Sequence, residues 1–264
     1  LDARFSEWVD AHVIFCNTLV DRIVPGGLSG VEAEDAWDEI GYQDEMLTVC
    51  EPYRLFAIES VKPLEFAGAD PNIIICDDIA PYRERKVRLL NGTHTIMVPA
   101  ALLAGCETVR DAMEDEEIGS FVRRVLFEEL VPSINAEGAE EFANDVVERF
   151  LNPYIKHALL DITLQQTMKL RVRIVPAIVE LASRGHSIDA IAFGFAAYLE
   201  LLSRDIELRE DSLAHSIRSA SGQDIDDYVR AACGNTDVWG VDLNTVGDFA
   251  TRVTEHLRAM RVHA

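Results

Sequence analysis

The chain has 264 residues, 48% of them hydrophobic, which is enough apolar material for one large domain or two small ones with a real core. Its 24 basic and 46 acidic residues give a formal net charge of -22. Such a surface repels phosphate backbones and anionic lipid headgroups, which argues against nucleic acid and acidic membranes as partners. An anionic small molecule would need a local cationic pocket to overcome this field.

The five cysteines are odd in number and widely spaced, a pattern typical of thiols in a reducing compartment. We therefore expect a cytoplasmic protein. No C-x-x-C, H-x-x-x-H or H-E-x-x-H spacing is present, so we expect no metal site. The most apolar helical stretch, residues 188–202, is interrupted by Asp189 and Glu200 and is too short to span a bilayer.

The first 76 residues combine helical and strand patterns. Phe5, Trp8 and Val9 lie at helical spacing, and Ser29 begins the S-x-x-E sequence of a capping box. Short apolar runs between prolines and glycines predict strands. The expected elements are a helix over 1–11, a turn over 17–27, a helix from 29 to about 41, and strands at 47–50, 55–58 and 73–75. They predict a small mixed α/β lobe.

From residue 77 onwards nearly every segment has helical character, and glycines and prolines mark the breaks. The expected helices are 81–104, 108–113, 118–130, 139–151, 154–183, 188–203, 212–219, 225–232 and 246–260. The sequence therefore predicts a mainly α protein, with a helical body over 77–264 beside the lobe over 1–76.

The segment PYRERKVRLLNGTHT, residues 81–95, contains a lysine, an asparagine and a histidine with the spacing Lys-x4-Asn-x2-His. This spacing resembles the signature of the long-chain, metal-independent polyol dehydrogenases, the mannitol dehydrogenase family. Three segments, FCNTLVDRIVPG at 15–26, DDIAPYRERKV at 77–87, which overlaps the start of the segment 81–95, and RFLNPYIKHALLDI at 149–162, look like motifs of its tagaturonate reductase branch. The resemblance runs in order from Trp8 to about Pro176.

The resemblance implies a multi-helical domain like the C-terminal domain of 6-phosphogluconate dehydrogenase. Family members carry a Rossmann domain ahead of this region, and no G-x-G-x-x-G follows a strand in this chain. We therefore expect the Rossmann domain to be absent here. The chain would be the substrate-side domain of a longer NAD-dependent enzyme, with that Rossmann domain as its partner.

By resemblance, Lys86 is the general acid/base, Asn91 polarises the substrate carbonyl, and His94 orients the substrate. On a helix of 3.6 residues per turn, these side chains project at about 0°, 140° and 80°, so they can face one cavity. Each has a plainer alternative: a surface lysine, a packing amide and a satisfied core histidine.

A free lysine has a pKa near 10.4, so catalysis near neutral pH requires burial or neighbouring cations to lower the pKa of Lys86. The three arginines at 83, 85 and 88 would act in this direction, whereas Glu84 and Asp21 would oppose it. The resemblance places Asp21 near the lysine. The alternative is that Asp21 and its neighbour Arg22 form a structural ion pair that holds a turn.

A second cluster contains the candidate substrate-binding residues His157, Lys169, Arg171 and Arg173. Lys169 matches a lysine that approaches the substrate in the family, and three cations within five residues could bind a carboxylate. Alternatively, some of these cations pair with carboxylates on neighbouring helices.

These features predict NAD-dependent interconversion of D-tagaturonate and D-altronate. The alternatives are a fructuronate reductase, a mannitol 2-dehydrogenase, or a helical interaction module without catalysis. Asp161 stands where the polyol-specific branch has an arginine, which argues against mannitol as the substrate. Gln165 stands where tagaturonate reductases have asparagine, so the match to that branch is imperfect.

Overall fold

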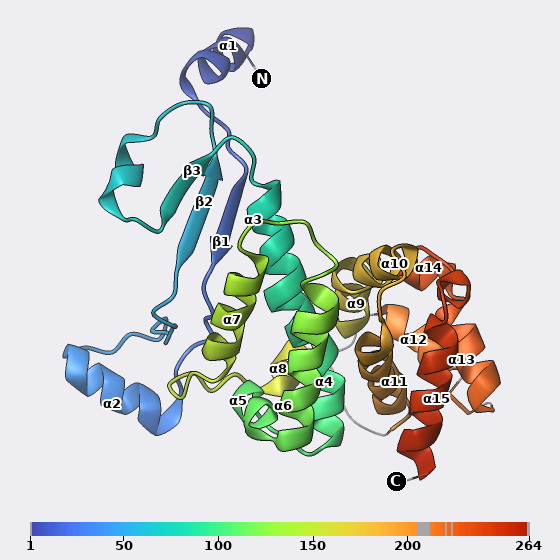
Figure 1. Cartoon of the computed structure of the whole chain (residues 1–264). Coiled ribbons are helices and arrows are strands. Elements are labelled where there is room, and N and C mark those ends of the chain that lie inside the picture. The colour runs from blue at the N-terminus through green and yellow to red at the C-terminus, as the bar shows by residue number, and fades with distance from the viewer. Residues whose placement is uncertain (1, 205–211, 220, 223, 263–264) are drawn as a thin grey trace.

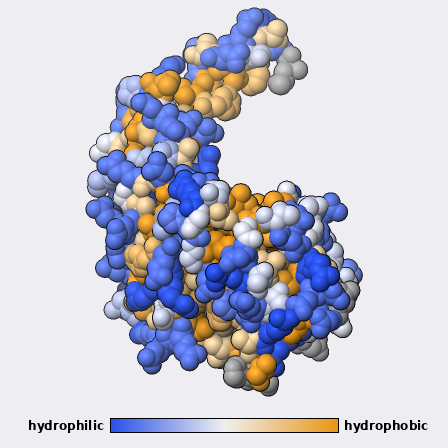
Figure 2. Space-filling view, turned by 45° about the vertical axis from the view of Figure 1, so that its right-hand side comes forward, coloured by the Kyte–Doolittle hydropathy of each residue, from blue (hydrophilic) through white to orange (hydrophobic). Residues whose placement is uncertain are grey.

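The computed structural model describes residues 2–204, 212–219, 221–222 and 224–262. An N-terminal lobe extends as an arm from a larger helical body, and the first helix lies at the far end of this arm (Figure 1). The space-filling view shows a broad hollow between the arm and the body, with hydrophobic side chains on the body side of it (Figure 2). The predicted architecture, mainly α with a small α/β lobe, is confirmed.

The lobe is built on a three-stranded sheet in the order β1-β2-β3. The middle strand β2 runs antiparallel to β1, with Phe56 opposite Val20, and parallel to β3, with Phe56 opposite Ile73. Helix α2 lies away from the sheet, at the lower end of the lobe in Figure 1. The bounds are α1 Ala3–His12, β1 Thr18–Asp21, α2 Gly30–Ile40, β2 Leu55–Glu59, the 3₁₀ helix η1 Glu65–Ala69 and β3 Ile73–Cys76.

Three details of the predicted lobe are wrong. The expected turn over 17–27 begins with strand β1, and the expected strand at 47–50 forms only an isolated bridge between Thr48 and Gly27. Both errors arise because strand pairing depends on partners distant in the sequence. Ser29 precedes α2 but makes no capping hydrogen bond with its side chain, and Glu32 pairs with Lys156 instead.

The central element of the body is one continuous helical segment from Ala80 to Leu103, close to the predicted 81–104. It consists of α3 Ala80–Arg85, a π-helix η2 Lys86–Gly92 and α4 Thr93–Leu103. Residues 93–101 are all buried, because α6, α8, α9 and α11 pack around α4. The segment therefore holds its side chains on a rigid backbone.

The remaining helices surround this segment, and α11 packs between α4 and α15. The expected single helix over 154–183 is wrong, because the chain breaks at Gln165, whose φ of 55° is left-handed, and again before Pro176. The bounds are α5 Val109–Glu114, α6 Glu116–Arg123, π-helix η3 Arg124–Leu130, α7 Ala139–Phe150, α8 Leu159–Ile162, α9 Gln166–Arg173, α10 Val175–Ser183, α11 Asp189–Ser203, α12 Ser212–Arg218, α13 Ile225–Cys233, α14 Thr236–Trp239, η4 Leu243–Thr245 and α15 Phe249–Val262. Within the described ranges, no helix has the length and apolarity needed to cross a membrane.

The contact between α11 and α4 depends on Gly194. A Cβ atom at this position would lie 2.5 Å from Ile96 Cγ1 and 2.9 Å from the Ile96 carbonyl oxygen. We expect Gly194→Ala to lower the free energy of unfolding by about 1–3 kcal/mol, since the backbone of α4 has to move. Denaturant unfolding measures this, with Gly68→Ala as the control, because nothing lies within 4 Å of a Cβ there. Equal stability of the two variants would contradict the close packing.

Candidate active site

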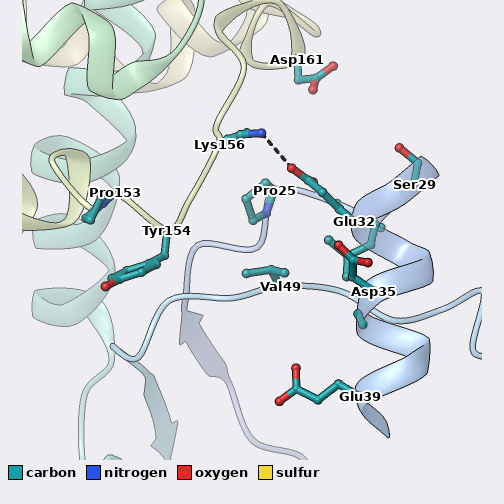
Figure 3. Close-up of a pocket in the computed structure, with 14 residues that line it drawn as sticks. Pro25, Ser29, Glu32, Asp35, Glu39, Val49, Pro153, Tyr154, Lys156 and Asp161 are labelled. Carbon is teal, nitrogen blue, oxygen red and sulfur yellow. Dashed lines mark hydrogen bonds and ion pairs between the residues drawn. The ribbon is translucent and has the colours of Figure 1, made fainter. Parts of the chain in front are cut away.

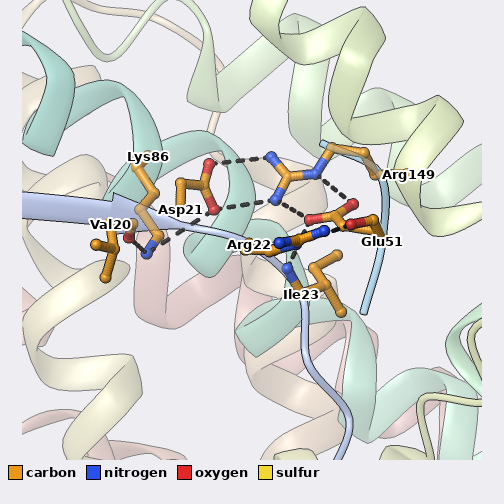
Figure 4. Close-up of polar contacts among 7 residues, drawn as sticks. All are labelled: Val20, Asp21, Arg22, Ile23, Glu51, Lys86 and Arg149. Carbon is orange, nitrogen blue, oxygen red and sulfur yellow. Dashed lines mark hydrogen bonds and ion pairs between the residues drawn. The ribbon is translucent and has the colours of Figure 1, made fainter. Parts of the chain in front are cut away.

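Lys86 opens the π-helix η2 and reaches the end of strand β1. Its Nζ donates a hydrogen bond of 2.6 Å to the Val20 carbonyl oxygen and lies 3.8 Å from Asp21 Oδ1 (Figure 4). The side chain is 21% exposed, so the amine is held in a mostly enclosed place but remains accessible. An ammonium group has three donors, and the hydrogen bond to Val20 occupies one of them, so donors remain for a substrate oxygen.

The pKa of Lys86 is lowered, mainly because burial disfavours the charged amine. Asp21 opposes this shift, while the cations Arg149 and Arg173 reinforce it. The sequence correctly includes Asp21 among the opposing charges. It misidentifies the cations, which come from α7 and α9 rather than from the arginines that flank Lys86.

Asp21 belongs to a buried network of charges with Arg149 and Glu51, whose exposed fractions are 1%, 8% and 1%. Arg149 donates to both carboxylate oxygens of Asp21, at 3.0 and 2.9 Å, and to both of Glu51, at 3.0 and 2.7 Å (Figure 4). Its guanidinium also lies 4.1 Å from the centre of the Tyr53 ring. Asp21 is therefore bound to Arg149, and not to its sequence neighbour Arg22, whose Nε donates to the Glu51 carbonyl oxygen.

Asn91 lies five residues after Lys86, within the same π-helix. Because π-helical hydrogen bonds join residues five apart, Asn91 comes closer to the face of Lys86 than the 140° expected for an α-helix. Among the described residues, its side-chain amide has no hydrogen-bond partner, while its backbone carbonyl accepts from Thr95. The amide is therefore available to a substrate oxygen.

His94 is buried on α4, where its ring stacks on Phe150 at 4.1 Å and meets the edge of the His157 ring at 5.1 Å. His94 Nε2 and His157 Nδ1 are buried without a hydrogen-bond partner in the described part of the chain. Buried polar atoms are normally paired, so these two mark a place for a water or a substrate hydroxyl.

Both imidazoles have a pKa below the ordinary value, mainly because of burial; Lys169 lowers both further, whereas Asp161 opposes the shift at His157. For His94 the shift is large, and the cations include Arg149, Arg173 and Lys169. The His94 ring is therefore neutral near neutral pH and can hydrogen-bond a hydroxyl or carbonyl without changing charge.

Only part of the second candidate cluster lies close to Lys86 and His94. Lys169 Nζ donates to the Ile162 carbonyl oxygen at 2.9 Å, and its charge acts on both histidines. Arg173 donates to Thr95 Oγ1 at 3.1 Å and lies near Lys86 and His94. Arg171, by contrast, turns towards α14, where it donates to the Asp237 carbonyl oxygen at 3.1 Å, away from the other cations.

Arg173 is half-buried, and burial lowers its pKa. It forms no ion pair with any carboxylate among the described residues. A cation in this state is costly unless an anion approaches it. Arg173 is therefore a candidate partner for an anionic group of a substrate.

A cavity of about 600 Å³ lies elsewhere, between α2 and the segment 153–161 (Figure 3). Glu32, Asp35 and Glu39 project into it from α2, and Lys156 is paired with Glu32 at 2.8 Å. Its acidic lining disfavours an anionic ligand, and none of the Lys86, Asn91 and His94 side chains lines it.

In the described ranges, no three His, Cys, Asp or Glu side chains are grouped to hold a metal ion.

Comparisons with known proteins identify the family of the chain. Residues 78–261 match the mannitol dehydrogenase C-terminal domain, and residues 1–75 match the mannitol dehydrogenase Rossmann domain. The chain therefore belongs to the mannitol dehydrogenase family. The boundary between the two matches lies beside the predicted boundary at 76/77. The match assigns the lobe to the Rossmann domain, whereas the sequence patterns grouped it with the helical body.

Individual relatives are similar along most of the chain. It is 38% identical to an altronate oxidoreductase of Bacillus subtilis over 97% of the chain and 55% of that protein. It is 41% identical to one of Shigella flexneri over 75% of the chain and 42% of that protein. The chain thus spans about half the length of the curated relatives it matches.

Among solved structures, Pseudomonas fluorescens mannitol 2-dehydrogenase, in a ternary complex with NAD and D-mannitol, matches 99% of the chain and 55% of its own, with a TM-score of 0.81 and 23% identity. A substrate-free D-sorbitol dehydrogenase matches with a TM-score of 0.79 and 23% identity. These likenesses show the fold.

Proposed function

We propose that the chain is the catalytic part of an NAD-dependent oxidoreductase that interconverts D-tagaturonate and D-altronate. The observation that carries this proposal is the half-buried Lys86 amine at the end of β1, with the free Asn91 amide on the same π-helix and His94 one turn further on. The relatives named altronate oxidoreductase support the choice of substrate.

The donor set in this chain fits a nicotinamide cofactor. Lysine, asparagine and histidine transfer protons and donate hydrogen bonds, but none of them can accept a hydride, which NAD supplies or accepts when bound. The Rossmann side of the protein, to which residues 1–75 belong, would hold the dinucleotide. The groups on η2 and α4 would then serve the oxygen of the reacting carbon.

In the reduction of the ketone, Lys86 gives a proton from Nζ to the carbonyl oxygen, and in the oxidation it takes this proton back. The Asn91 amide donates a hydrogen bond to the same oxygen as negative charge grows on it. Neutral His94 holds that oxygen or the neighbouring hydroxyl through the unpartnered Nε2. The lowered pKa of Lys86 favours this exchange because it brings the amine nearer to working pH.

Arg173 and Lys169 support a uronate rather than a neutral sugar. The Arg173 guanidinium has no carboxylate partner among the described residues, and the carboxylate of a uronate would supply one through a charge-assisted hydrogen bond. Lys169 adds positive charge close to the two histidines. Together they form a local cationic region in a chain whose net charge is -22.

The test is an assay of the full-length protein. NADH and NADPH oxidation would be followed with D-tagaturonate, D-fructuronate and D-fructose. We expect tagaturonate with NADH to give the highest kcat/KM. A preference for fructuronate would move the proposal to the fructuronate reductases, and a preference for fructose would overturn the uronate assignment.

Arg173→Met is expected to lower kcat/KM for tagaturonate about 10- to 100-fold relative to fructose, because a hydrogen bond to a charged group contributes about 1.5–3 kcal/mol. The matched control is Arg171→Met, which removes a guanidinium two residues away that faces α14. This control should keep the wild-type ratio. Equal effects of the two substitutions would show that the loss is one of general charge and not of a specific contact.

A further inference from the structure

The charges around Lys86 come from separate segments that converge on one carboxylate. Asp21 at the end of β1 is fixed by two hydrogen bonds from Arg149 on α7, which leaves its Oδ1 at 3.8 Å from the Lys86 amine. Glu51 fixes Arg149 by two further hydrogen bonds and is itself anchored by the Ile23 N–H at 2.6 Å. The Asp21 carboxylate therefore cannot rotate freely.

We propose that Arg149 is a positioning residue that locks the Asp21 carboxylate against the Lys86 amine, with Glu51 holding Arg149 in turn. This inference rests on the proposed acid/base role of Lys86. Among the described residues, Arg149 makes no hydrogen bond with the amine, and its four hydrogen bonds go to Asp21 and Glu51. It acts through Asp21, which it orients by a rigid two-pronged contact that only a guanidinium can make.

The arrangement also sets the charge that faces Lys86. The ionised groups acting on the amine are Asp21 from β1, Arg149 from α7 and Arg173 from α9. Burial is the largest influence and lowers the pKa of Lys86, Asp21 opposes this shift, and Arg149 offsets part of the effect of that anion. Arg149 thus orients the aspartate beside the lysine and also limits how far that aspartate favours the charged amine.

The network crosses the boundary between the two family matches. Asp21 and Glu51 belong to the segment 1–75, whereas Lys86 and Arg149 belong to the segment 78–261. Its four hydrogen bonds join the lobe to the body at the point where the amine is held. The position of the lobe and the position of the acid/base are therefore fixed by the same contacts.

The test measures the pKa of Lys86 directly in the full-length protein. Trace labelling with acetic anhydride across a pH series, read at the Lys86 peptide by mass spectrometry, gives the pKa without any turnover. We expect Arg149→Met to raise this pKa by about 1 unit or more, and Asp21→Asn to lower it by a similar amount, because a charge within about 4–6 Å shifts a pKa by roughly 1–3 units. The control is Arg83→Met, which removes an exposed cation three residues from Lys86 and should leave the pKa unchanged.

Arg149→Lys separates orientation from charge. It keeps the cation but loses the two-pronged contact, so we expect kcat to fall while the pKa of Lys86 changes little. A wild-type pKa of Lys86 in a folded Arg149→Met variant overturns the proposal. If that variant does not fold, Asp21→Asn decides: a lower pKa supports the proposal, and an unchanged one overturns it.

The labelling result is independent of the substrate assay. If the wild-type protein turns over tagaturonate but the Arg149 and Asp21 variants keep the wild-type pKa of Lys86, the role of Arg149 is overturned and the proposed function stands. A shift in the predicted directions, in a protein that reduces none of the three ketoses, supports the geometry and overturns the proposed function.

Discussion

Lys86→Met is expected to lower kcat for tagaturonate reduction by about 10²- to 10⁴-fold, the usual contribution of a general acid/base. Methionine retains most of the length and apolar surface of lysine, so it fills the space between η2 and β1 but cannot transfer a proton. The carbonyl of Val20 loses its 2.6 Å donor, and we therefore expect a small loss of stability as well. Steady-state kinetics of the full-length protein, with thermal unfolding of the same sample, measures both.

Lys156→Met is the matched control. Lys156 is an exposed lysine that pairs with Glu32 at the acidic cavity, and it is not among the charges that act on Lys86. We expect kcat to stay within about twofold of wild type, since exposed ion pairs contribute little. If Lys156→Met abolished turnover and Lys86→Met did not, the active site would lie in the cavity beside α2.

The second large effect concerns stability. Arg149→Met is expected to lower the free energy of unfolding by about 3–5 kcal/mol, because it leaves Glu51 buried without its cation and leaves Asp21 with Lys86, at 3.8 Å, in place of two hydrogen bonds from Arg149. Chemical denaturation at neutral pH, with wild type as the reference, measures this loss. A loss below about 1 kcal/mol would show that the network is solvated rather than buried.

A combined variant tests whether charge is the cause. Adding Asp21→Asn and Glu51→Gln to Arg149→Met removes the charge of both buried carboxylates while keeping their shapes. We expect this triple variant to regain much of the lost stability, because a neutral cluster of similar volume can replace a buried ion pair at little cost. A further loss of stability in the triple variant would contradict this explanation.

The helical part of the fold was largely accessible from the sequence, because glycines and prolines mark its breaks and its apolar residues recur at helical spacing. The expected helices over 139–151 and 188–203 correspond to α7 and α11. Strand β1 was missed because TLVD is short and half polar, and its strand conformation depends on pairing with β2, more than thirty residues later in the chain. The π-helical stretch of η2 carries no signal in its residue pattern.

For the candidate site, local spacing was informative and distant pairing was not. Lys86, Asn91 and His94 are close in the sequence, so one helix places them. Arg149 bonds to Asp21 and Glu51, which are 128 and 98 residues away in the sequence. No local sequence pattern predicts ion pairs between residues so far apart. The sequence analysis grouped Arg171 with Arg173, but residues two apart on a helix do not face the same side, and the structure separates them.

The most direct measurement is a crystal structure of the full-length protein with NAD and D-altronate. The account predicts the reacting hydroxyl oxygen within about 2.6–3.2 Å of Lys86 Nζ, with Asn91 and His94 in hydrogen-bonding reach and Arg173 on the carboxylate. An altronate bound in the cavity beside α2, or one whose reacting carbon lies out of reach of Lys86, would contradict it.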